Sequence, residues 1–106
     1  MFGYQAIDSI CLASTGSSCV SDFDFISVST TGLKVSGVVG LAANPSIYHP
    51  YYQIIAPKGY ISALYDAGAI EKKMFSFALL DTDSYLDIGS INPTAFTNEL
   101  VWIDSI

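Results

Sequence analysis

Apolar and polar positions alternate along much of this chain in short runs, which is the pattern expected of half-buried β-strands. Four such runs lie at residues 4–12, 20–29, 74–80 and 85–91. Polar or glycine- and proline-containing clusters separate them at residues 30–32, 81–84 and 92–94. Clusters of this composition favour turns. The pattern therefore predicts antiparallel strands joined by short connections.

Two further runs are more continuously apolar. In residues 35–41 the β-branched pair Val38 and Val39 stands between Gly37 and Gly40. Valine favours an extended, buried strand, whereas glycine allows a bend or a close approach by another backbone. We therefore predict a buried strand over residues 35–41 and a final apolar strand over residues 100–103.

One helix is predicted, over residues 60–67. Ile61, Leu64 and Tyr65 recur at i, i+3 and i+4 and form one apolar face, and Gly68 is placed to end the helix. Residues 44–57 hold three prolines and three tyrosines and predict a long aromatic loop. The fold class predicted from the pattern is mainly β with one short helix.

Composition limits the function classes. The chain has 106 residues, enough for one small domain or a segment of a larger one. Ten acidic residues against four lysines and no arginine give a net charge of −6, which disfavours nucleic acid as a partner. No apolar run is long enough to cross a membrane, and the first residues lack the basic start of a signal peptide. We expect neither a nucleic-acid nor a membrane partner.

The candidate metal ligands do not form a recognisable set. The acidic stretch 81–87 resembles a calcium loop in charge only, because Leu86 stands where a glycine is needed and Asn92 where a glutamate is needed. His49 has no histidine or cysteine partner at metal-binding spacing. Gly37 and Gly40 lack the lysine and hydroxyl residue of a phosphate-binding loop. The sequence predicts no metal and no cofactor.

The two cysteines offer two alternatives. Cys11 and Cys19 flank a small polar run typical of a hairpin loop, and they can pair across adjacent strands if the register brings their side chains together. Closing so short a loop would stabilise the fold by about 2.5 kcal/mol. The alternative is a pair of free thiols in a reducing compartment.

Seven short motifs, in order and at matching spacing, resemble those of the pepsin-like aspartic proteases, peptidase family A1. The element Gly37–Ala42 resembles the family's Asp-Gly-Ile-Leu-Gly-Leu strand, although Ser36 replaces the aspartate. The other matching segments are Gly3 with Asp8–Ile10, Phe25–Val28, Leu64–Ile70, Phe75–Leu79, Ile88–Asn92 and Leu100–Ile103.

The resemblance implies a place in a bilobal β-barrel fold. Residues 1–106 would form the later part of the N-terminal lobe and run into the sheet between the lobes. Gly37, Val39 and Gly40 would support the loop that carries the first catalytic aspartate. Val35 and Val38 match positions that line the substrate pocket, and an ordinary core role explains them equally well.

Catalytic residues are absent from the chain. It contains no Asp-Thr-Gly or Asp-Ser-Gly, the motifs whose paired aspartates share a proton and activate water in this family. Asp81-Thr82-Asp83 has an aspartate in place of the glycine, and the Tyr-Gly-x-Gly motif of the flap is missing. The chain is therefore expected to be an internal fragment of an aspartic endopeptidase, inactive alone.

The implied partners are a protein or peptide substrate and the missing parts of the same protease fold. The resemblance and a disulfide together imply a secreted or a lysosomal or vacuolar protein. The alternative function is a non-catalytic β-rich module that keeps the scaffold and binds peptides or proteins.

Overall fold

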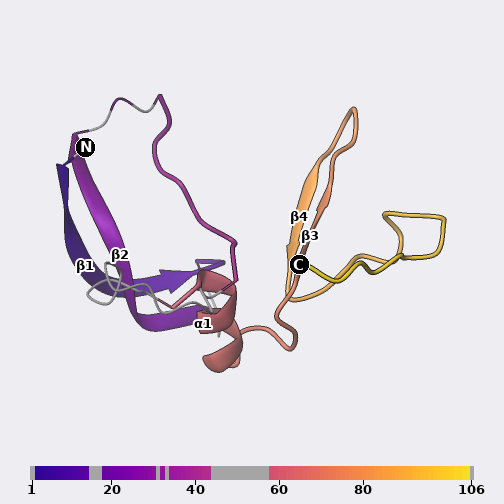
Figure 1. The fold of residues 1–106 in the computed structure, drawn as a ribbon, viewed down its shortest axis with the longest axis horizontal. Coiled ribbons are helices and arrows are strands. Elements are labelled where there is room, and N and C mark those ends of the chain that lie inside the picture. Colours follow the sequence, from indigo (N-terminus) through magenta and orange to yellow (C-terminus); the bar gives the residue numbers. More distant parts are fainter. Residues whose placement is uncertain (1, 15–17, 31, 33, 44–57, 106) are drawn as a thin grey trace.

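A computed structural model describes residues 2–14, 18–30, 32, 34–43 and 58–105. The chain forms two antiparallel hairpins with one short helix between them (Figure 1). The elements, in chain order, are β1 (Phe2–Cys11), β2 (Cys19–Thr30), α1 (Tyr60–Asp66), β3 (Phe75–Ala78) and β4 (Tyr85–Ile88). The prediction of a mainly β chain with one short helix is confirmed.

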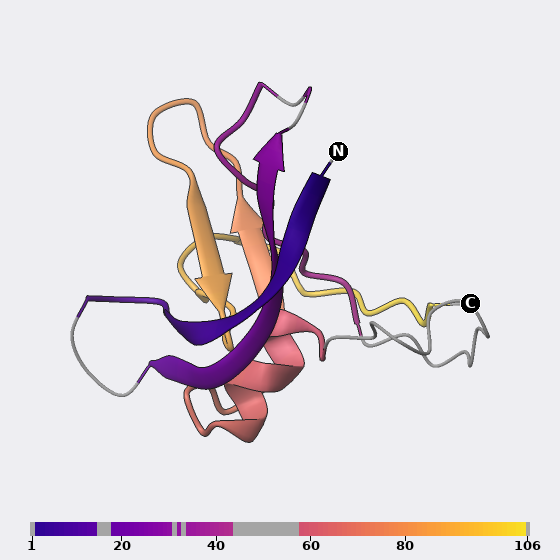
Figure 2. The ribbon, with the colours of Figure 1, turned by 90° about the vertical axis from the view of Figure 1, so that its left-hand side faces the viewer.

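The first hairpin pairs β1 with β2 and bends sharply over the helix (Figure 2). Its register runs from Gly3 opposite Val28 to Cys11 opposite Cys19, with a shift between Asp8 and Ile10. In the shifted stretch Asp22 adopts the left-handed conformation, at a φ of 53°. An extra residue of this kind bends a strand and increases its twist, which lets β2 follow the surface of α1.

The helix α1 is held mainly by burial, because seven residues are too few to be stable alone. Tyr60, Ile61, Ala63 and Leu64 are buried, and Leu64 is completely inaccessible to solvent. The sequence placed Tyr65 on this face, but its side chain is exposed and its ring lies 5.0 Å from the Lys73 ammonium. Ile61 and Leu64 are therefore buried as predicted, but the buried face includes Tyr60 and Ala63 and not Tyr65.

Gly68 ends α1 as expected. Its φ of +74° is left-handed, the Gly68 N–H donates to the Tyr65 carbonyl, and the Ala69 N–H donates to the Leu64 carbonyl. These two bonds satisfy carbonyls that the last turn of a helix leaves free. Glycine is favoured there because a Cβ strains a left-handed backbone.

The second hairpin is short. Phe75 lies opposite Ile88 and Ala78 opposite Tyr85. Ser84 closes the turn between the two strands, because its Oγ accepts a hydrogen bond from the Leu80 N–H and donates one to the Leu80 carbonyl. At the other end the Gly89 N–H donates to the Met74 carbonyl. Gly89 has a φ of +86°, and a Cβ there would lie 2.7 Å from the Ile70 Cβ. This close approach joins the hairpin to the segment that follows α1.

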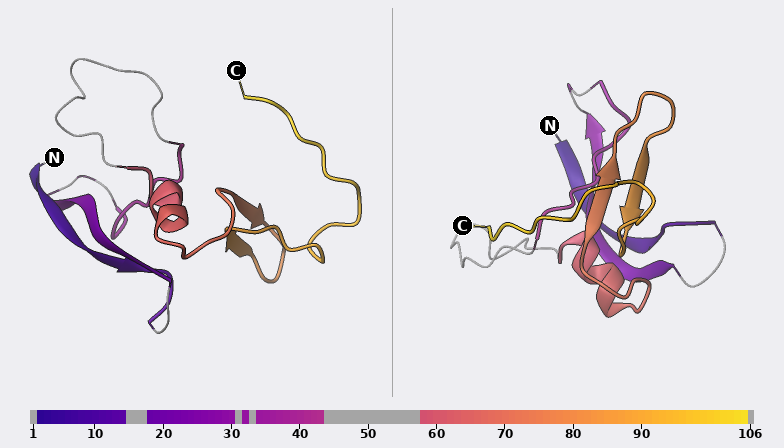
Figure 3. Two further views of the ribbon diagram at one scale, coloured as in Figure 1. Left: turned by 90° about the horizontal axis from the view of Figure 1, so that it is seen from below. Right: turned by 90° about the vertical axis from the view of Figure 1, so that its right-hand side faces the viewer.

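Seen from below, α1 sits between the two hairpins (Figure 3). The hydrophobic core lies where α1 meets these hairpins. It consists of Val20 of β2, the four buried apolar side chains of α1 and Ile70, with Ile10, Phe23, Leu41, Ala69 and Ile88 packed against them. The radius of gyration is 16.2 Å, against about 13 Å for a compact chain of this length. Much of the apolar surface therefore lies outside this core.

Two predicted strands do not form. Residues 34–36 form a bend, residues 37–43 and 100–105 have no regular secondary structure, and none of them belongs to either sheet. Val38 and Val39 are 78% and 70% exposed, and Trp102 and Ile103 are exposed as well. Apolar composition and β-branching favour a strand, but a strand also needs a neighbour that satisfies its backbone groups. Neither segment has such a neighbour in the described parts of the chain.

The aromatic loop predicted for residues 44–57, which includes His49, lies outside the described residues. Within the described ranges, no helix has the length and apolar character needed to cross a membrane.

Candidate functional site

The best-formed local feature is the disulfide between Cys11 and Cys19. The two residues are direct cross-strand partners with Cα atoms 4.0 Å apart, so the register brings the sulfurs together as the first of the two alternatives requires. One step further out, the Leu12 N–H donates to the Ser18 carbonyl and continues the ladder. The prediction of a disulfide hairpin is confirmed, and this bond fixes the start of β2 next to the buried Val20.

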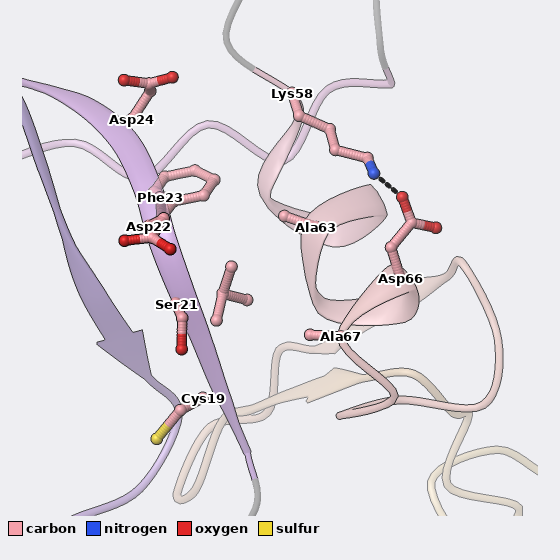
Figure 4. A pocket seen from close by; sticks show the side chains of 10 residues that line it. Cys19, Ser21, Asp22, Phe23, Asp24, Lys58, Ala63, Asp66 and Ala67 are labelled. Atoms are coloured by element: carbon pink, nitrogen blue, oxygen red, sulfur yellow. Dashed lines mark ion pairs between the residues drawn. The ribbon is translucent and has the colours of Figure 1, made fainter.

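A hollow of about 450 Å³ lies beside this disulfide, between β2 and α1 (Figure 4). One wall is the part of β2 from Cys19 to Asp24. The other wall consists of Lys58 before α1, Ala63 and Asp66 in it, and Ala67 directly after it. Val20 and Ala63 give it an apolar floor because both belong to the core. The bend of β2 over the helix creates this hollow.

Three carboxylates and one ammonium group surround the hollow. Lys58, just before α1, forms an ion pair with Asp66, the last residue of the helix (Figure 4). On the other wall Asp24 accepts a hydrogen bond from the Gln5 side-chain amide at 3.1 Å. Because both members of the ion pair are substantially exposed, it contributes no more than about 1 kcal/mol.

Phe23, which lines the hollow, forms an aromatic contact with Tyr60. The Phe23 ring packs edge-on against the Tyr60 ring with centroids 5.5 Å apart. Burial raises the pKa of the Tyr60 phenol above its usual value of 10.0 because it disfavours the phenolate. Tyr60 is therefore neutral at physiological pH and acts as a packing residue here.

Carboxylates are the main chemical groups among the described residues that line the hollow. Among the described residues on its walls, Ser21 has the only hydroxyl group and none is a histidine. Among the described residues, no group of three or more histidine, cysteine, aspartate or glutamate side chains is arranged to hold a metal ion. The carboxylates among these described residues can attract a cationic group.

The residues predicted from sequence to serve the substrate site lie elsewhere. Val35 and Val38 are 57% and 78% exposed, in the irregular segment that leads to the half-buried Leu41. A Cβ added at Gly37 or at Gly40 would meet no described atom within 4 Å. None of the described residues that line the hollow beside α1 comes from this segment.

No local pattern in the sequence predicts the hollow. Asp22 and Asp24 stand two apart on β2, a spacing that signals a shared face, but Lys58 and Asp66 are separated from them by the undescribed residues 44–57. Only the bend at the bulge brings these groups together, and the sequence carries no clear signal for that bend.

Comparisons with models of known protein families, with curated proteins and with solved structures found no match for this chain.

Proposed function

We propose that this chain is the later part of the N-terminal lobe of a pepsin-like aspartic endopeptidase, which hydrolyses peptide bonds only when completed by the rest of that fold. The observation that carries the proposal is the exposure of residues 35–41. Their glycine and valine pattern is that of a central strand, yet Val38 and Val39 face solvent. The cost of leaving such residues in water is removed if a neighbouring strand covers them.

The hairpins and the helix support the same proposal. The segments that resemble consecutive family motifs include β3, the end of α1 and the start of the turn after β4, and they form a strand, a helix end and a turn. Asn92 caps that turn, because its side-chain oxygen accepts from the Thr94 N–H at 3.0 Å. The disulfide is compatible with an oxidising, secreted or vacuolar location.

Reading the codons on both sides of this chain tests the proposal without any protein. A family member carries Asp-Thr-Gly and Tyr-Gly-x-Gly before residue 1 and a second Asp-Thr-Gly or Asp-Ser-Gly after residue 106. Stop codons and untranslated sequence on both sides would overturn the proposal of a protease and favour that of a peptide-binding module.

Activity is the second test. The complete polypeptide should cleave a denatured protein at acid pH and be inhibited by pepstatin, whereas the 106-residue chain should be inactive. Replacing the aspartate of either predicted motif by asparagine should abolish cleavage. Asp81→Asn is the matched control, because Asp81 lies exposed in the β3–β4 turn and should leave activity unchanged.

The substitution Gly40→Ala should affect the stability of the complete protease and of the isolated chain differently. In the isolated chain a Cβ at Gly40 meets no described atom within 4 Å, so stability should be unchanged. In the complete protease the proposed close approach of another backbone would make the same substitution destabilising by about 1–3 kcal/mol. Equal stability effects in both polypeptides would contradict the role of Gly40 as a close-contact glycine.

A further inference from the structure

The C-terminal third of the chain combines exposed apolar side chains with one sign of charge. Among the described residues, eleven of the twenty large exposed hydrophobic side chains lie between Phe75 and Ile103. Residues 74–105 also hold five acidic residues and no lysine or arginine. A surface that is apolar and uniformly acidic differs from an ordinary solvated face, where charges of both signs are mixed.

The hairpin β3–β4 presents its aromatic side to solvent. Phe75, Phe77 and the adjoining Leu79 are 40%, 59% and 79% exposed, whereas Ser76 and Ala78 are half-buried. Phe77 lies opposite Leu86, and its ring stands edge-on to that of Phe75 at 5.9 Å. The usual orientation, with the large apolar residues inside, is reversed.

This apolar side is continuous with the core. Phe75 lies opposite Ile88, which packs against the core cluster, and exposure increases step by step from there toward the turn. We call Phe75, Phe77, Leu79 and Leu86, together with Asp81 and Asp83 at the turn, the acidic apolar face. Each strand of this sheet has only the other as a neighbour in the described part of the chain, so its outer edges are open to a further strand.

We propose that the acidic apolar face binds an extended strand of another protein that alternates apolar and basic residues. Added to an edge of the hairpin, such a strand places its apolar residues beside Phe77 or Leu86. Because side chains alternate along a strand, its lysine or arginine residues lie on the opposite side, where Asp87 pairs with Ser76, and reach Asp81 and Asp83 at the turn. Charge selects this partner. A second copy of the chain brings the same negative charges, and like charges brought together oppose association.

The test uses the oxidised 106-residue chain and a short fluorescent peptide in which valine and lysine alternate, with binding followed by anisotropy. The peptide should bind saturably, and binding should weaken as salt is raised. The matched peptide of alternating valine and glutamate should not bind. Equal binding of both peptides, or binding of neither, would overturn the proposal.

Variants locate the site. Phe77→Ser combined with Leu79→Ser should weaken binding about tenfold, and both side chains are exposed, so the fold is retained. Tyr4→Ser combined with Ile7→Ser on β1 is the control, because these residues are equally exposed but lie on the other hairpin. Equal weakening by both pairs would overturn the assignment to this face.

A second pair of variants tests the charge. Asp81→Asn combined with Asp83→Asn should weaken binding about threefold and reduce its salt dependence, whereas Glu71→Gln should not.

Sedimentation of the chain alone tests whether a second copy of the chain occupies the face. Self-association that is lost on Phe77→Ser would show that a second copy covers the face and would overturn the proposal.

Discussion

The two hairpins use apolar residues to different effect. In β1–β2 the strand bends over α1, and Val20, Phe23 and Ile10 reach the core. In β3–β4 only Ile88 reaches it, and the aromatic residues of β3 face solvent. The difference shows that alternation in sequence is enough to form a hairpin, but a hairpin buries its apolar side only where another element covers it.

Length and curvature account for the difference. β2 has 12 residues and a bulge at Asp22 that turns it around the helix, whereas β3 and β4 have four residues each. A short, uninterrupted pair cannot wrap a neighbour. The described residues thus contain one completed core and one apolar surface that remains uncovered.

The largest expected effect comes from emptying the completed core. Leu64→Ala removes a fully buried side chain and should lower the free energy of unfolding by about 2–5 kcal/mol. Phe77→Ala removes a larger but exposed side chain and should change it by no more than about 0.5 kcal/mol. Urea unfolding followed by circular dichroism measures both, and equal losses would erase the distinction between the two regions.

Removing the disulfide should have the next largest effect. Cys11→Ser combined with Cys19→Ser releases a loop with a sequence separation of 8 and should cost about 2.5 kcal/mol. The loss should appear as a lower urea midpoint for α1, because the bond holds Val20 against the helix. A double variant as stable as the parent chain would show that β2 keeps its position without the bond.

Two left-handed glycines test how firmly the hairpins are joined. Gly89→Ala combines backbone strain with a Cβ at 2.7 Å from the Ile70 Cβ and should cost about 2 kcal/mol. Gly68→Ala has the strain but open space around it and should cost about 1 kcal/mol. If thermal unfolding showed the same loss for both, the contact between Gly89 and Ile70 would not join β4 to the core.

The smallest effect is a pH dependence confined to the completed core. Burial raises the pKa of Tyr60, so the folded state holds the phenol proton more tightly than the unfolded chain does. The contribution of this proton to the free energy of unfolding is complete below pH 10.0 and is lost as pH rises through the higher pKa of the folded state. Tyr60→Phe should remove this part of the alkaline loss of stability. Alkaline unfolding of the parent and the variant at several pH values would show it, and parallel curves would argue against the burial of this phenol.

The sequence predicted the elements that depend on local signals. The two hairpins, the helix and its end at Gly68, and the pairing of Cys11 with Cys19 all follow from alternation, spacing or turn composition. It failed where the outcome depends on partners far along the chain, as at Val38 and Trp102. The hollow beside α1 was not predicted either, because it depends on the bulge at Asp22 and not on any local motif.

Native-state hydrogen exchange of the oxidised chain tests most directly whether there is one completed core and one uncovered surface. We expect slow exchange at the amides of β2 and α1, and exchange close to the free-chain rate in β3, β4 and residues 100–105. Slow exchange confined to the first group would support the account, since protection follows burial and cooperative packing. Equal protection of Phe77 and Leu64 would contradict it.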